Sequence, residues 1–222
     1  MYKICFHGFL LYFCGMNEEL KNIMSKVRDL YKNYGIKSIT MDDVARELGM
    51  SKKTLYQYVN DKEDLVDKFV ESEISTRQEE ICKCFKTGYN AIEELFEISV
   101  FMNRMMRERN PATEYDLKKY YPAQYQKIVK ARREGTYSYL MLNLRKGKKE
   151  GLYRADMDEE VIAKLYLSRS ENVHFGEIFT VSEFTSSQLF IELLKYHIRG
   201  IATEKGIIEL ENKIKGLETS NI

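Results

Sequence analysis

Six side chains between residues 52 and 58 are of types that hydrogen-bond to nucleic acids. They supply two ammonium groups, three hydroxyl groups and one amide: Lys52, Lys53, Thr54, Tyr56, Gln57 and Tyr58. Ammonium and hydroxyl groups donate to phosphate oxygens, and Lys and Gln side chains can read the edges of bases. The alternative interpretation is a solvated polar face on a small helical hairpin.

A helix-turn-helix pattern over residues 41–60 would hold these side chains in place. Ala45 is small enough to let two helices cross closely, and Gly49, four positions later, takes the backbone through the tight turn. Thr40 and Ser51 are expected to cap the two helices, and acids follow Thr40 in the first turn. The pair shares a small apolar core of Val44, Leu48, Met50 and Leu55.

Apolar residues recur at helical spacing along most of the remaining chain, and no segment alternates as a strand would. The sequence therefore predicts an all-α fold, in agreement with only 2 prolines and 12 glycines. An apolar stripe in the tail fits a further helix. Besides the pair above, helices are expected over residues 17–34, 63–85, 90–110, 113–120, 122–150, 158–175 and 185–204.

The composition is that of a globular protein and excludes one broad class of nucleic-acid binder. Of the 222 residues, 44% are hydrophobic and 31% are charged, which is unlike a disordered chain. The net charge of +1 excludes a protein that coats nucleic acid through bulk charge. Residues 118–150 nevertheless carry ten Lys and Arg against two Asp and Glu. We interpret them as cations gathered on a helix, with contact to an anionic ligand or DNA as the alternative.

The sequence has no arrangement typical of catalysis or metal binding. It lacks a nucleophile–base pair, a metal motif and a Gly-rich phosphate loop, so neither an enzyme nor a cofactor is expected. Cys82 and Cys84 are interpreted as small helix side chains of a reduced protein, with a thiol switch as the alternative. His174 and His197 are interpreted as interface residues rather than pH sensors.

Residues 1–15 are apolar and unlike the rest of the chain. They are too short to span a membrane, and they lack the small residues of a signal-peptide cleavage site. We expect Met16 to be the biological start, and the alternative is a native extension that packs on the body of the protein.

The residues from Ile39 to Leu65 resemble the DNA-binding domain of the TetR/AcrR (tetracycline-repressor) family. The likeness is strong over about residues 20–70 and weaker beyond. Its most distinctive parts are Thr54-Leu55-Tyr56, Tyr58-Val59 and Asp61-Lys62-Glu63-Asp64-Leu65, and it continues in Glu150–Asp156 and Arg199–Ala202.

The resemblance implies an N-terminal three-helix helix-turn-helix DNA-binding domain, followed by a larger helical regulatory and dimerisation domain. On this basis residues 1–16 are a variable or non-native extension, residues 17–64 bind DNA, and residues 65–222 bind a ligand and dimerise. The implied protein is a cytoplasmic homodimer without a membrane partner. It acts most often as a repressor, bound to a palindromic operator until a small-molecule effector binds. The alternative is a small-molecule or thiol sensor that acts through a protein partner and has a degenerate DNA-binding domain.

The resemblance also assigns roles to individual residues of the helix-turn-helix. Thr40 contacts a phosphate as well as capping its helix, and Lys62 holds a phosphate together with a helix N-terminus. The start of the recognition helix reads bases through Lys52, Lys53 and Thr54. Gln57 faces the groove, while Tyr56 and Tyr58 contact phosphate or sugar. Lys37, in the preceding loop, is interpreted as an ordinary surface side chain.

The larger domain contains two further sets of candidates. Met and aromatic side chains suit an adaptable ligand cavity: Phe96, Phe101, Met102, Met105, Met106, Tyr121, Tyr125 and Tyr137. The resemblance places the dimer interface on the last two long helices, through Ile162, Leu165, Tyr166, Phe190, Leu194, His197 and Ile201.

Overall fold

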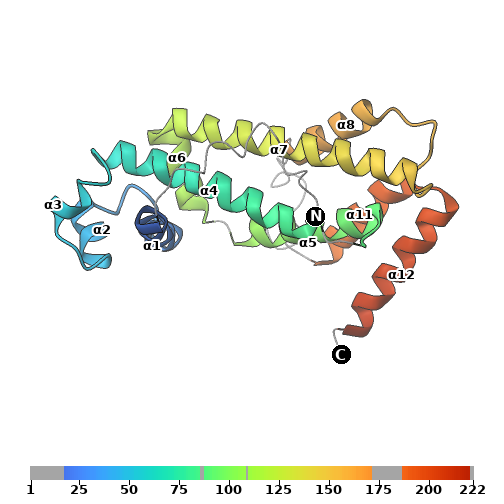
Figure 1. Ribbon diagram of the computed structural model, residues 1–222, viewed down its shortest axis with the longest axis horizontal. Helices are drawn as coiled ribbons and strands as arrows, with labels where there is room; N and C mark the ends of the chain where they lie inside the picture. The colour runs from blue at the N-terminus through green and yellow to red at the C-terminus, as the bar shows by residue number, and fades with distance from the viewer. Residues whose placement is uncertain (1–17, 86–87, 109, 172–186, 221–222) are drawn as a thin grey trace. The chain divides into compact units, whose positions relative to one another are not determined.

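A computed structural model of the chain describes residues 18–85, 88–108, 110–171 and 187–220, and within them every named element is a helix (Figure 1). The all-α prediction is confirmed. Within these ranges, β-type backbone pairing is limited to one isolated antiparallel bridge between Tyr153 and Ala202. The extension at 1–16 and His174 lie outside the described residues. Among the described residues, no helix is long and apolar enough to cross a membrane.

Contacts divide the chain into two compact units. The first comprises residues 1–82 and 109–132, and the second comprises residues 83–108 and 133–222. The predicted domain boundary at residue 64 is not a boundary between these units. Residues 109–132, which come later in the chain, belong to the same unit as the N-terminal residues. The division into a DNA-binding and a ligand-binding domain stays a prediction.

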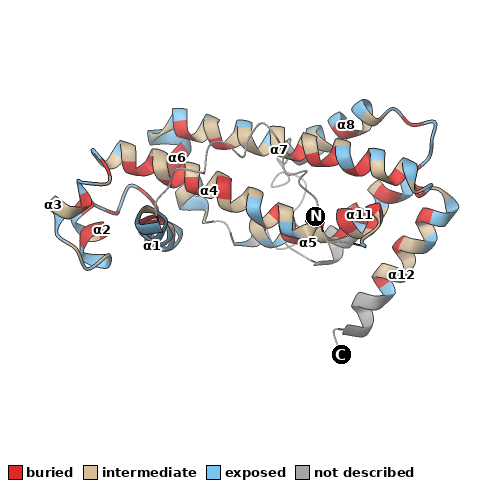
Figure 2. Cartoon of the chain, in the orientation of Figure 1, coloured by how far each residue is buried: buried red, intermediate tan, exposed pale blue. Residues whose placement is uncertain are grey.

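The first unit is built from helices of the N-terminal half and from a segment that follows α5. Buried side chains recur along α4 and on the inner face of α1 (red in Figure 2). Its core includes Tyr31, whose ring meets Phe69 edge to face at a centroid distance of 5.1 Å. The helices are α1 (Glu18–Tyr34), α2 (Met41–Glu47), α3 (Lys52–Leu55), α4 (Lys62–Cys84), α6 (Pro111–Tyr120) and the start of α7 (Pro122–Lys149).

Two side-chain hydrogen bonds, both accepted by carbonyls near the C-terminal end of α1, hold α6 against that helix. The side chain of Asn110, which caps α6, donates to the carbonyl of Lys32 at 2.6 Å, and the Thr113 hydroxyl donates to that of Tyr31 at 2.5 Å. Gly35 ends α1 with a φ of 77°, and a Cβ there would lie 3.1 Å from the Asp116 carboxylate. The left-handed backbone and the close approach both favour glycine.

The second unit contains α5 (Ala91–Arg107), the rest of α7, α8 (Glu159–Glu171), α11 (Ser187–Ile201) and α12 (Glu204–Ser220). Helix α5 packs against α11 and α12, so the tail helix expected from the apolar stripe is present. The core of the unit includes Leu95, Phe96 and Ile98 of α5 and Leu210 and Ile214 of α12.

The connector after α7 joins two sequence segments that lie far apart in the chain. Tyr153 pairs with Ala202 across the bridge, and the amide of Arg154 donates to the carbonyl of Ile201 at 2.8 Å. The buried ring of Tyr153 fills the space above Gly147, where a Cβ would lie 2.0 Å from the ring. Its hydroxyl lies 3.0 Å from the Asn143 side-chain oxygen.

Candidate nucleic-acid interface

The start of α2 is held by a reciprocal cap between Thr40 and Asp43. The Asp43 amide donates to the Thr40 hydroxyl oxygen at 3.2 Å, while the Thr40 amide donates to the Asp43 carboxylate at 2.9 Å. The Thr40 hydroxyl also donates to that carboxylate, at 2.6 Å. These bonds from Thr40 lower the pKa of Asp43 from its ordinary value. Because both donors of Thr40 are used by Asp43, a phosphate at Thr40 would have to displace this carboxylate.

The turn between α2 and α3 follows the chemistry expected from the sequence. Gly49 has a φ of 65°, and the Met50 amide returns to the carbonyl of Ala45 at 3.0 Å. Ser51 caps α3 by accepting the Thr54 amide at 3.0 Å. Ala45 is buried between the two helices, as its small size predicts.

Helix α3 does not reach residue 60, where the predicted helix-turn-helix pattern ends. It ends at Leu55, and the amides of Gln57 and Tyr58 then bond to carbonyls three residues back, both at 3.0 Å. Tighter bonding of this kind is common at helix ends. The Asn60 amide, beyond the end of α3, donates to the Asp64 carboxylate at 2.7 Å.

Most of the predicted contact residues of α3 and its turn face solvent together. Lys52, Lys53 and Gln57 are exposed, and Tyr56 is 43% exposed. The opposite side holds Leu55, which is fully buried. Thr54 is only half-exposed. Its hydroxyl lies 2.8 Å from that of Ser51.

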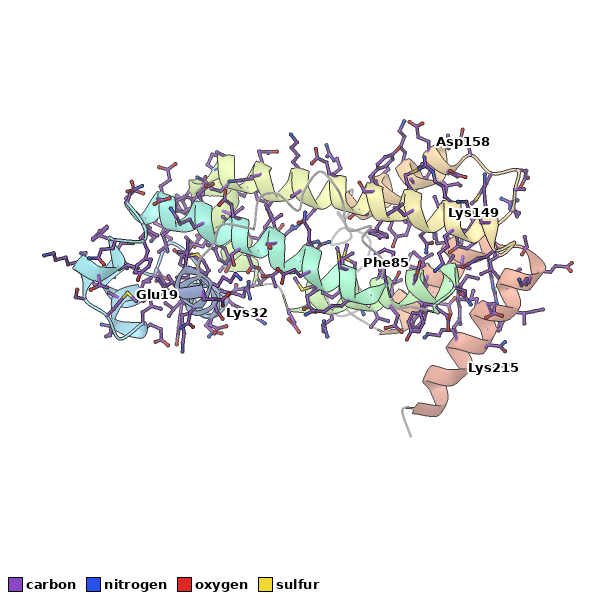
Figure 3. The ribbon with its side chains drawn as sticks, viewed as in Figure 1. Glu19, Lys32, Phe85, Lys149, Asp158 and Lys215 are labelled. Carbon is purple, nitrogen blue, oxygen red and sulfur yellow. The ribbon has the colours of Figure 1, made fainter. Side chains whose placement is uncertain are left out.

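Tyr58 is placed differently from the other five side chains. It is half-buried against the core of the first unit. A hydrogen bond to the carboxylate of Glu19, labelled on α1 in Figure 3, raises the pKa of its hydroxyl. The structure therefore brings four of the six residues together on an exposed face, leaves Thr54 half-buried and ties Tyr58 to α1.

The two lysines at the start of α3 differ in their electrostatic environment. The Lys52 ammonium lies 2.9 Å from a carboxylate oxygen of Asp42 on α2, and this hydrogen bond raises the lysine pKa. Lys53 is exposed and has no carboxylate partner among the described residues. The sequence indicated both lysines but gave no signal for the Asp42 partner, which lies on the preceding helix.

Lys62 is the first residue of α4, as the predicted phosphate contact requires. Its ammonium donates to the carbonyl of Lys37 at 3.3 Å, and partial burial lowers its pKa against the opposing effect of Asp116 and Asp43. The ammonium thus lies beside the loop that leads into α2. Thr40 caps the helix at the end of that loop.

Residues 23–69, which contain the α2–α3 pair and the start of α4, match the family model described as "Bacterial regulatory proteins, tetR family". Over this stretch the chain is similar to the TetR family. It is 25% identical over 187 residues to an uncharacterized HTH-type transcriptional regulator of Bacillus subtilis, YvaF, covering 83% of this chain and 96% of that protein.

Solved structures share the fold of this chain. A transcriptional regulator from Cytophaga hutchinsonii matches with a TM-score of 0.72 at 16% identity, covering 84% of this chain and 100% of that one. CprB from Streptomyces coelicolor, determined with its operator, matches with a TM-score of 0.60 at 17% identity over 91% and 98% of the chains. A regulator from Saccharomonospora viridis in complex with choline has a TM-score of 0.61 at 17% identity over 85% and 100%.

The predicted ligand-contact residues fall into both units. Tyr121 and Tyr125 pack against the core of the first unit. In the second, Phe96 and Phe101 are buried, and the half-buried residues are Met102, Met105 and Tyr137. The side chain of Met106 lies outside the described residues. These assignments stay predictions.

The predicted dimer residues differ in exposure. Leu194 and Ile201 are buried within the second unit, whereas Leu165 is 61% exposed. Tyr166 and His197 bring α8 against α11 through an edge-to-face ring contact at 4.7 Å. Ile162 is half-buried, and the Phe190 side chain lies outside the described residues. Sequence spacing missed two further exposed apolar side chains on these helices, Val161 and Tyr196.

Proposed function

We propose that this chain is a ligand-responsive repressor that binds a palindromic operator as a cytoplasmic homodimer. The observation that carries the proposal is the exposed face of α3 and its turn, which presents Lys52, Lys53, Tyr56 and Gln57 together. Cations that hold phosphates and an amide that can pair with adenine are the groups needed to read a major groove.

The proposed roles of the two regions follow from the residues that each contains. The capped α2–α3 pair orients the reading face, and Lys62 at the start of α4 adds a phosphate contact beside it. Dimerisation is assigned to α8 and α11, where Val161, Leu165 and Tyr196 leave apolar surface exposed. Two copies related by a two-fold axis would place two recognition elements on successive major grooves.

Regulation by a small molecule is proposed for the helices of the second unit. It is supported by the buried aromatic and half-buried methionine side chains of α5. The structural relative from Saccharomonospora viridis holds choline, which supports a ligand for this fold without specifying the one bound here.

A selection experiment tests the proposal. The full chain would be incubated with a random duplex library, and bound duplexes would be sequenced after several rounds. We expect an inverted repeat, and sedimentation of the complex should give two protein chains per duplex. Failure to enrich any sequence would contradict the proposal and favour a sensor that acts through a protein partner.

A further inference from the structure

Helix α6 and the loop before α2 carry an exposed group of lysines and tyrosines that the helix-turn-helix does not explain. We call Lys37, Tyr115, Lys118, Lys119 and Tyr120 the α6 cluster. The Lys37 ammonium donates to the Tyr120 hydroxyl at 2.9 Å and lies 4.2 Å from the ring centroid. The Lys119 ammonium donates to the Tyr115 hydroxyl at 2.8 Å. All five side chains are exposed.

The positive charge of the α6 cluster depends on whether the acids of the same helix, Glu114 and Asp116, pair with its lysines. Within the described ranges, none of its lysines forms an ion pair with a carboxylate. The nearby Asp116 is buried, and it accepts the backbone amide of Lys37 at 2.8 Å instead of a lysine side chain. Hydrogen bonds from Lys37 and Lys119 lower the pKa of Tyr120, in agreement with a locally positive surface.

The cluster is continuous with the residues proposed to contact DNA. The carbonyl of Lys37 accepts a hydrogen bond from the Lys62 ammonium at 3.3 Å, and Lys37 precedes the Thr40 cap by three residues. All of these residues belong to the first unit. The bonds from Asn110 and Thr113 to the end of α1 hold α6 in this position.

We propose that the α6 cluster binds backbone phosphates of DNA outside the base pairs that α3 reads. The inference rests on the proposed function, because it extends the same DNA surface. Lysine ammonium groups and tyrosine hydroxyl groups can donate to phosphate oxygens, and such contacts position a protein without reading sequence. The cluster would therefore lengthen the bound duplex and add affinity that is independent of the flanking bases.

DNA is favoured over an anionic membrane because of the side chains present. The cluster contains no aliphatic residue that would enter a lipid layer, and it adjoins Lys62 rather than an apolar face. A helix that binds at a membrane surface needs such an apolar side.

The test compares two lengths of the duplex that the full chain selects from a random library. One duplex is trimmed to the inverted repeat, and the other carries ten arbitrary base pairs at each end. Affinity is measured by fluorescence anisotropy at several salt concentrations. The variant is K118A/K119A, and the matched control is K149A/K205A, which removes two exposed lysines of the second unit (Lys149 is labelled in Figure 3).

We expect the wild-type chain to bind the long duplex more tightly and with a steeper salt dependence. K118A/K119A should lose this gain, and its salt slope on the long duplex should fall by about 2 to 4 for a dimer, since each phosphate contact contributes about 0.9. The control should keep the gain. Thermal unfolding followed by circular dichroism would establish that both variants are folded.

Several results would overturn the inference while leaving the proposed function intact. The first is that the wild-type chain binds the two duplexes with equal affinity. The second is that K118A/K119A loses the same affinity on both duplexes. The third is that K118A/K119A binds both duplexes like the wild-type chain and instead loses binding to phosphatidylglycerol vesicles. If no duplex is selected at all, the proposed function itself fails.

Discussion

The ammonium group of Lys52 lies 2.9 Å from a carboxylate oxygen of Asp42, across the turn between α2 and α3. Both side chains are exposed, so water and salt screen the pair and it contributes little to folding stability. Its importance lies in charge: a lysine assigned to base reading is already neutralised by an acid on the same surface.

Replacing Asp42 should therefore strengthen DNA binding. Asp42→Asn releases Lys52 and removes a negative charge from a surface that must approach phosphates. We expect affinity to rise about threefold to tenfold, an effect typical of one exposed charge. Anisotropy with the selected duplex measures it, and Asp29→Asn, an exposed acid on α1, is the control. An unchanged or lower affinity would mean that Asp42 instead orients Lys52 for reading.

The cap of α2 should be visible in the titration of Asp43. Hydrogen bonds from Thr40 hold the Asp43 pKa below its ordinary value of 3.8. Since the folded pKa is lowered, the ionised carboxylate stabilises α2 at neutral pH, and this stabilisation is lost as the pH falls below 3.8 through the folded value. Carbon-13 NMR of the carboxyl group would measure the shift. A folded pKa of 3.8 or above would contradict it.

Two substitutions of Thr40 separate the capping role from side-chain size. Thr40→Val removes the hydroxyl, so the Asp43 pKa should move back toward 3.8 and the melting temperature should fall by about 2 to 4 °C. Thr40→Ser keeps the hydroxyl and should retain most of both properties.

Lys62 and Lys52 should affect binding in different ways. Lys62→Ala should weaken binding to all duplexes similarly and reduce the salt slope by about 0.9 per subunit, because the side chain is assigned to a phosphate. Lys52→Ala should instead relax the preference at one base pair, worth about 1 to 3 kcal/mol of discrimination. Competition with duplexes that carry single base changes distinguishes the two. An unchanged salt slope in Lys62→Ala would refute its assignment.

The close packing above Gly147 predicts a large difference between two glycines of α7. A Cβ at Gly147 would lie 2.0 Å from the buried ring of Tyr153, so Gly147→Ala should destabilise the fold by about 1 to 3 kcal/mol. Gly135 has nothing within 4 Å of such a Cβ, and Gly135→Ala should stabilise the helix by up to about 1 kcal/mol. Urea unfolding measures both. Equal effects would mean that the connector moves aside at little cost.

The local chemistry of the helix-turn-helix was predictable because neighbouring residues determine it. Thr40 and Ser51 bond to amides three residues away, and Gly35 and Gly49 adopt the positive φ that helix ends require. These features depend on residue type and short spacing, which a sequence displays directly. The end of α3 was less predictable: the helix stops at Leu55, and the Asn60 amide, at the end of the expected span, donates to the Asp64 carboxylate instead of a helix carbonyl.

Interactions between distant residues were not predictable in the same way. Lys37 meets Tyr120 across more than eighty positions, and nothing in the spacing of either residue indicates the other. Likewise, Tyr121 and Tyr125 were predicted as ligand contacts of the larger domain, and they pack against the core of the first unit. Periodicity tells which residues share a face and leaves open which helix covers it.

The bridge between Tyr153 and Ala202 has a consequence for which substitutions this join can tolerate. It ties the connector after α7 to the end of α11 through backbone groups: the Arg154 amide donates to the Ile201 carbonyl, and the Thr203 amide donates to the Leu152 carbonyl. Backbone hydrogen bonds do not depend on the identity of the side chain, so most replacements of Arg154 should leave the join in place. Gly147 and Tyr153 are different, because the Tyr153 ring packs directly on Gly147, and there the identity of the side chain decides whether the join fits.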